Sequence, residues 1–180
     1  MKALVVYESM YGNTHQLAEA IADGLRTAGP AEVVPVDQAD ASHLDGTDLV
    51  VVGGPTHAHS MSRESTRKAA VAAAQEPDSE LDLDPDAEGP GLRDWLSTVE
   101  GLPSSAAAFD TRVDAPAALT GRASKAIARK LHHLGCTLVV PPQSFLVTKE
   151  TRLEPDELEH ARRWGAEVAT TVAVTAHPTA

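Results

Sequence analysis

The chain has 180 residues, 42% of them apolar, which is enough for one domain with a sizeable core. Its formal net charge of −11 argues against a nucleic-acid-binding protein, whose affinity would depend on basic side chains at the phosphates. The single cysteine, Cys136, excludes an intrachain disulfide framework and a cysteine-rich metal site, and no apolar run is long enough to span a membrane. We therefore expect a cytoplasmic protein without membrane insertion, in which Cys136 is a buried structural residue.

Strand and helix patterns alternate along the chain. Apolar runs predict strands at 2–8, 32–36, 48–53, 104–109 and 136–140, the last interrupted by Pro141-Pro142 and resumed at 145–148. Helical spacing predicts helices after Thr14, from Ser62 as N-cap to Gln75, at 92–99, at 122–134 and from Pro155 onward. This alternation is typical of a doubly wound α/β domain, which binds ligands at the carboxyl ends of its strands.

A segment rich in acidic residues and proline, residues 76–91, separates two of the predicted helices; we call it the acidic loop. Residues 76–100 hold nine Asp and Glu side chains against Arg93 alone. One interpretation is an exposed, solvated insertion. The other is a docking surface for a basic partner, because acidic surfaces steer encounters with basic ones.

The loop after the first predicted strand has the composition of a phosphate-binding loop. Ser9, Asn13 and Thr14 offer short side-chain donors, and Gly12 allows a tight turn. The helix that follows presents unpaired N–H groups and the positive end of its dipole. These residues predict a loop that binds a phosphate monoester tightly and does not react with it. The alternative is an ordinary turn and helix cap.

Ser9-Met10-Tyr11-Gly12-Asn13-Thr14, between a strand and a helix, resembles the FMN-phosphate loop of flavodoxins and related flavoproteins. Gly53-Gly54-Pro55-Thr56-His57 and Phe109-Asp110-Thr111-Arg112 fall where that family has its two loops at the isoalloxazine ring. The resemblance covers about residues 2–169. It implies a flavodoxin-like domain over residues 1–176, with a tail at 177–180, and one non-covalently bound FMN. The implied fold is a single doubly wound, five-stranded parallel sheet with strand order 2-1-3-4-5. The resemblance assigns FMN binding to Ser9, Met10, Tyr11, Gly12, Asn13, Thr14, Pro55, Thr56, His57, Ala58, Phe109, Asp110, Thr111 and Arg112.

The ring loops depart from many flavodoxins because they contain no Tyr or Trp, and Phe109 fits a strand end in the core better than a ring contact. His57 and His59 are candidate neighbours of the flavin or a substrate. We expect no metal site, because neither the pair His57 and His59 nor the adjacent His132-His133 has metal-ligand spacing or accompanying carboxylates. Arg112 either raises the flavin potential, or points to solvent or pairs with Asp110 or Asp114.

The predicted function is electron transfer through FMN, to a redox partner protein or a small electron acceptor. Two alternatives stay open. One is an FMN-dependent NAD(P)H oxidoreductase acting on quinones or similar acceptors, which the open ring loops favour. The other is an interaction module of flavodoxin fold that has lost FMN.

Overall fold

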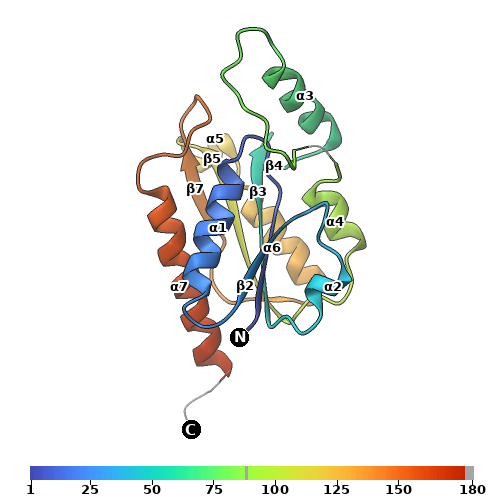
Figure 1. Cartoon of the computed structure of the whole chain (residues 1–180), viewed down its shortest axis with the longest axis vertical. Helices are drawn as coiled ribbons and strands as arrows, with labels where there is room; N and C mark the ends of the chain where they lie inside the picture. Colours follow the sequence, from blue (N-terminus) through green and yellow to red (C-terminus); the bar gives the residue numbers. More distant parts are fainter. Residues whose placement is uncertain (88, 177–180) are drawn as a thin grey trace.

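A central sheet lies between two layers of helices in the computed structural model, which describes residues 1–87 and 89–176 (Figure 1). The parallel strands run in the order β2-β1-β3-β5-β6, and β7 continues alongside β5. Their bounds are β1 Ala3–Tyr7, β2 Ala31–Pro35, β3 Leu49–His57, β5 Ser105–Val113, β6 Thr137–Leu138 and β7 Gln143–Val147. The doubly wound fold and the predicted order 2-1-3-4-5 are confirmed, with β6 and β7 together in the fifth position.

The predicted number of five strands is wrong, because the sheet has seven strands within residues 1–87 and 89–176. The fifth strand is split where Pro141-Pro142 interrupts it, since proline has no N–H to contribute to the ladder. In addition, β4 (Ser60–Met61) turns back antiparallel to the end of β3. The strand predicted to end at Phe109 continues to Val113, which brings Asp110, Thr111 and Arg112 into β5.

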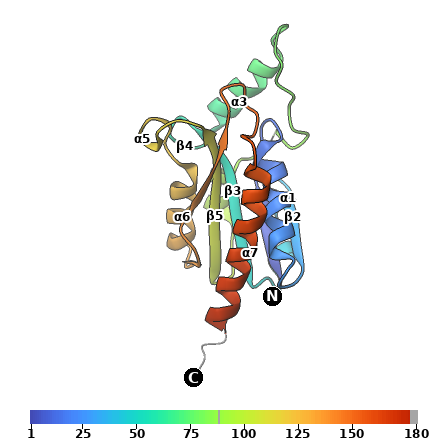
Figure 2. The same cartoon turned by 90° about the vertical axis from the view of Figure 1, so that its left-hand side faces the viewer.

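Successive residues of the strands point to opposite faces of the sheet, as the pleat requires. Ala3, Val5 and Tyr7 pack with helices α1 (Asn13–Leu25) and α7 (Glu157–Ala176), whereas Leu4 and Val6 pack on the side of α4 (Leu92–Thr98) and α6 (Ala123–His133). Figure 2 shows the sheet between α6 on one side and the pair α1 and α7 on the other. Both faces are covered, which explains the continuous apolar runs.

Helix boundaries differ from the predictions in small ways. The alanine-rich helix α3 (Glu64–Ala74) has Arg63 rather than Ser62 at its N-cap, and the Ser62 hydroxyl instead accepts a hydrogen bond from Arg67 Nη1. Two four-residue helices were not predicted, α2 (Ala41–Leu44) and α5 (Ala117–Thr120). In residues 1–87 and 89–176, no helix is long and apolar enough to cross a bilayer. The predicted tail, 177–180, lies outside the described residues.

The acidic loop and α3 project together beyond the carboxyl ends of the strands (Figure 1). Part of the loop is nevertheless packed against the domain. Asp84 and Ala87 are each only 5% exposed, and the Asp84 amide donates to the Met10 carbonyl oxygen at 2.9 Å. The interpretation of a fully solvated insertion is therefore wrong for this part of the loop.

Candidate functional site

Residues 9–14 join β1 to α1 and form the first wall of the candidate site. Gly12 is the N-cap of α1 and has φ of +80°, a left-handed conformation that glycine adopts at little cost. The Gly12 amide donates to Ser9 Oγ at 3.1 Å. The next three amides, of Asn13, Thr14 and His15, have no acceptor among the described residues. This helix N-terminus therefore has free donors and a positive dipole end for an anion.

Polar side chains connect this loop to the loops beside it. Thr14 is 2% exposed, and its hydroxyl lies 3.2 Å from that of Thr111 on β5. The Asn13 side-chain amide donates to the carbonyl oxygen of Thr151, in the turn after β7, at 2.8 Å. Three strand ends are thus held in fixed positions around one space.

The end of β3 forms a tight hairpin with β4. His57 pairs with Ser60, and the two residues between them, Ala58 and His59, both have positive φ. A two-residue hairpin of this kind normally uses glycine or asparagine, so Ala58 and His59 are under backbone strain. The hairpin packs against Gly121, where a Cβ atom would lie 2.3 Å from His59 Cα. Contact with a neighbouring loop therefore holds the strained turn in place.

Close packing also fixes the base of this hairpin. A Cβ atom at Gly53 would lie 2.1 Å from Phe109 Cε1, so only glycine permits β3 and the Phe109 ring to approach so closely. Phe109 is fully buried and packs edge-on against Phe145. Its side chain belongs to the core.

Asp110 links two of the loops beneath the site. Its side chain is fully buried, and Oδ2 accepts hydrogen bonds from the Ser124 amide at 2.7 Å and from Thr56 Oγ1 at 3.2 Å. Thr56 Oγ1 in turn accepts from the Ala123 amide at 3.0 Å. A carboxylate thus lies at the N-terminus of α6, where the helix dipole favours negative charge.

Arg112 lies at the edge of the site. Its Nη1 donates to the carbonyl oxygens of Ala115 at 2.6 Å and of Val113 at 3.3 Å. Its Nε is buried and has no partner within residues 1–87 and 89–176. The sequence analysis offered two alternatives to a role at the flavin: a guanidinium that points to solvent, or one that pairs with Asp110 or Asp114. The Arg112 guanidinium instead donates to backbone carbonyl oxygens.

These loops enclose a cavity of about 160 Å³. Ten of the fourteen residues predicted for FMN binding line it, and Gly12, Ala58, Phe109 and Asp110 do not. The sequence analysis missed Val113, Val147 and Thr151, which also line the cavity. Val147 and Thr151 come from β7 and its following turn, and no motif marks them. The cavity lining consists of Ser9, Met10, Tyr11, Asn13, Thr14, Pro55, Thr56, His57, Thr111, Arg112, Val113, Val147 and Thr151.

Two titratable side chains of this cavity, Tyr11 and His57, have perturbed pKa values, and burial raises the pKa of Tyr11. Burial lowers the pKa of His57 below its usual range, Glu8 opposes the change, and Arg67 reinforces it. His57 is consequently neutral at neutral pH. Glu8 is itself 5% exposed: its Oε2 accepts from the Leu92 amide at 2.8 Å, and its Oε1 is buried without a partner in the described part of the chain. Sequence reasoning missed Glu8, although a carboxylate at the end of an apolar strand is itself a signal.

Other sequence candidates lie elsewhere. Cys136 is 2% exposed, and burial raises the pKa of its thiol, so the prediction of a buried structural cysteine is confirmed. His59 is exposed at the tip of the β3–β4 hairpin, and His132 and His133 are exposed in the last turn of α6.

A doubly wound sheet with polar loops and a free helix N-terminus at the carboxyl ends of its strands is typical of α/β proteins that bind a phosphate-bearing ligand. Comparison with known families is more specific. The sequence model of the flavodoxin family matches residues 5–102, and the chain belongs to this family. It is an FMN-binding, flavodoxin-like protein, as the sequence resemblance predicted.

Individual relatives agree with this assignment. The NAD(P)H dehydrogenase (quinone) of Cupriavidus metallidurans is 38% identical over 76 residues, which cover 31% of this chain and 38% of that protein. The chain thus matches well under half the length of this relative. An archaeal flavodoxin is 22% identical, covers 96% of this chain and 99% of its own, and superposes with a TM-score of 0.64. Flavodoxin 1 from Bacillus cereus gives 22% identity, 94% and 98% coverage, and a TM-score of 0.62.

Proposed function

We propose that residues 1–176 form one domain that holds FMN non-covalently in the cavity around residues 9–14. The three free amides at the start of α1, with the hydroxyls of Ser9 and Thr14, would hold the phosphate. These donors fit a phosphate group because they lie at a helix N-terminus where no acidic side chain occupies the first turn. The isoalloxazine ring would lie between residues 55–58 and 109–112.

The size of the cavity has a consequence for the flavin. A volume of about 160 Å³ is smaller than that of a site enclosing a drug-sized ligand. Part of the FMN would therefore lie in the open mouth between the loops, with an edge of its ring exposed. An exposed edge is the feature through which electrons can reach an acceptor.

We further propose that the acceptor is a small planar molecule of the quinone class and that NAD(P)H is the electron donor. The observation that carries this proposal is the lack of an aromatic side chain that could cover the flavin in either ring loop. Residues 55–58 contain none except the His57 imidazole, and Phe109 is buried in the core. Tyr11 lines the cavity, but its hydroxyl donates to the Ala70 carbonyl oxygen at 2.9 Å, which ties it to α3. The name of the Cupriavidus relative supports the same donor and acceptor.

FMN, when bound, supplies the redox chemistry by accepting a hydride and releasing electrons. The protein supplies binding and electrostatics. Arg112, which is permanently cationic, would favour negative charge on the reduced ring. His57, neutral through its lowered pKa, offers one nitrogen as a donor and the other as an acceptor to the ring or to a bound quinone.

The test is an assay of NAD(P)H oxidation by the FMN-loaded protein, with and without a benzoquinone or naphthoquinone. We expect turnover that requires both FMN and quinone. A flavin-loaded protein that does not oxidise NAD(P)H would contradict the enzyme proposal and leave the electron carrier. A protein that does not bind FMN at all would instead indicate the interaction module.

The electron-carrier function remains a second candidate because of one observation, the concentration of negative charge in residues 76–100. Such a surface would attract a basic redox protein, at a rate that falls as salt screens the charges. Stopped-flow electron transfer to a basic acceptor protein at low and high ionic strength tests this function. A rate that does not depend on salt would argue against docking at this surface.

A further inference from the structure

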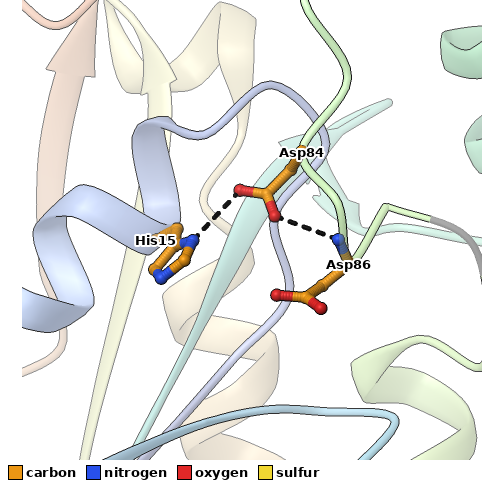
Figure 3. Close-up of side chains that lie close together, drawn as sticks. All are labelled: His15, Asp84 and Asp86. Carbon is orange, nitrogen blue, oxygen red and sulfur yellow. Dashed lines mark hydrogen bonds and ion pairs between the residues drawn. The ribbon is translucent and has the colours of Figure 1, made fainter.

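Three side chains with metal-binding atoms meet beside the loop of residues 9–14, on the side of the acidic loop (Figure 3). His15 comes from the first turn of α1, and Asp84 and Asp86 come from the acidic loop. Each side chain contributes a ligand atom, and these atoms all lie within 4.8 Å of one another. Figure 3 shows the two carboxylates and the imidazole facing one another across a short gap.

The cluster contains more negative charge than its surroundings neutralise. The Asp84 side chain is only 1% exposed, and its ion-pair partner among the described residues is His15, which is charged only when it is protonated. No Lys or Arg in residues 1–87 and 89–176 forms an ion pair with Asp84 or Asp86. Asp84 Oδ1 accepts from the Asp86 amide at 3.1 Å, whereas Oδ2 receives no hydrogen bond from a described residue. A buried carboxylate without a cation or a full set of donors is costly. An ion in the gap would remove that cost.

The spacing of the two best-placed ligands fits a bound metal better than a hydrogen bond. His15 Nδ1 lies 3.4 Å from Asp84 Oδ2, which is longer than a good N–H···O hydrogen bond. Two ligands each about 2.1 Å from a tetrahedral ion are themselves about 3.4 Å apart. A ligand atom of Asp86 lies within 4.8 Å of both of the others, so the same ion can be shared by all three side chains.

Tyr7 contacts two of the three ligands. The Tyr7 hydroxyl donates to Asp86 Oδ2 at 2.9 Å. The Tyr7 ring stacks on His15 with ring centroids 4.6 Å apart. Metal sites characteristically have such contacts behind the ligands themselves.

We propose that His15, Asp84 and Asp86 form a binding site for a divalent transition-metal ion, such as Zn²⁺ or Mn²⁺, that ties the acidic loop to α1. One imidazole nitrogen with two carboxylates suits these ions, and water completes the coordination. The site borders the FMN cavity: the cavity lining includes none of the three residues, while the His15 backbone amide is one of the free donors at the start of α1. Its occupation fixes the inner part of the acidic loop, which is otherwise held by the Asp84 amide and the Tyr7 hydroxyl.

The test uses the full chain, freed of metal with a chelator and titrated with Zn²⁺ by calorimetry and with Mn²⁺ by electron paramagnetic resonance. The variants are Asp86→Asn, which still offers Tyr7 an oxygen acceptor, and His15→Gln. Asp82→Asn is the matched control because it removes one charge from an exposed position of the same loop. Circular dichroism of the metal-free proteins verifies that each variant folds.

We expect one ion per chain in the wild type and in Asp82→Asn, with affinity at least about tenfold lower in Asp86→Asn and His15→Gln. A metal concentration 100 times the wild-type Kd should raise its Tm by about 5–10 °C and leave that of the two ligand variants nearly unchanged. Equal affinity in all four proteins would overturn the proposal and indicate general attraction to an acidic surface. Failure of both metals to bind the wild type would overturn it as well.

Discussion

Removal of the Thr14 hydroxyl should weaken FMN binding much more than riboflavin binding. Thr14 is 2% exposed, and its hydroxyl lies 3.2 Å from that of Thr111, so a Thr14→Val variant keeps the branched shape of the side chain and replaces the hydroxyl with a methyl group. The loss of one donor to a buried charged group costs about 1–3 kcal/mol. This corresponds to a Kd for FMN that is about 5- to 150-fold higher.

The assay is a titration of apoprotein with each flavin, followed by quenching of flavin fluorescence. Riboflavin has no phosphate, so its affinity for the variant should stay close to that for the wild type. Thr14→Ser is the matched control, because it restores the hydroxyl and should recover most of the FMN affinity. An equal loss for both flavins, or a Thr14→Ser variant as weak as Thr14→Val, would refute the assignment of this hydroxyl to the phosphate.

Three further predictions concern residues in and beside the cavity. Arg112→Ala should lower the two-electron flavin potential by about 20 mV, because a nearby cation favours the anionic hydroquinone by about 1 kcal/mol; spectroelectrochemistry that finds the potential unchanged would remove this role. Gly12→Ala should lower the Tm of the apoprotein by about 2–8 °C, because a φ of +80° is strained for any L-residue. The added Cβ atom itself has room, since its nearest neighbour, Asp84 Oδ2, would lie 3.8 Å away. An unchanged Tm would show that the loop relaxes. The pKa of His57 is lower in the folded state than in the unfolded chain. As the pH drops below about 6.5, the unfolded chain therefore binds a proton at His57 before the folded protein does, and the free energy of unfolding should fall. Denaturant unfolding at pH 8 and pH 5 should therefore show a smaller loss for His57→Gln than for the wild type, and equal losses would contradict the prediction.

The fold was predictable because its determinants are local. The sequence shows the apolar runs that form β1 and β3. It also shows Gly12, at which the loop after β1 ends and α1 begins. The number of strands could not be predicted, because β4 depends on a hairpin whose turn residues are Ala58 and His59. Glycine or asparagine at these positions would have indicated the turn. The split of the fifth strand was signalled by Pro141-Pro142.

The candidate site was predictable in its loops but not in the direction of each side chain. Asp110 follows an apolar strand as a ring-contacting residue would, yet its carboxylate turns inward to the Ser124 amide, which only the packing of α6 determines. The proposed metal site has no sequence signature at all. His15 lies far along the chain from Asp84 and Asp86, and the expectation of no metal site considered only histidines near one another in sequence. Tertiary structure alone brings these three side chains together.

The most direct test of the account is a heteronuclear NMR titration of the ¹⁵N-labelled apoprotein with FMN and, separately, with riboflavin. The account predicts that the amides of Asn13, Thr14 and His15, which have no acceptor among the described residues, shift strongly downfield with FMN and much less with riboflavin, because only FMN brings a phosphate to the start of α1. If FMN binds while these three amides keep the shifts seen with riboflavin, the phosphate lies elsewhere and the proposed site is wrong.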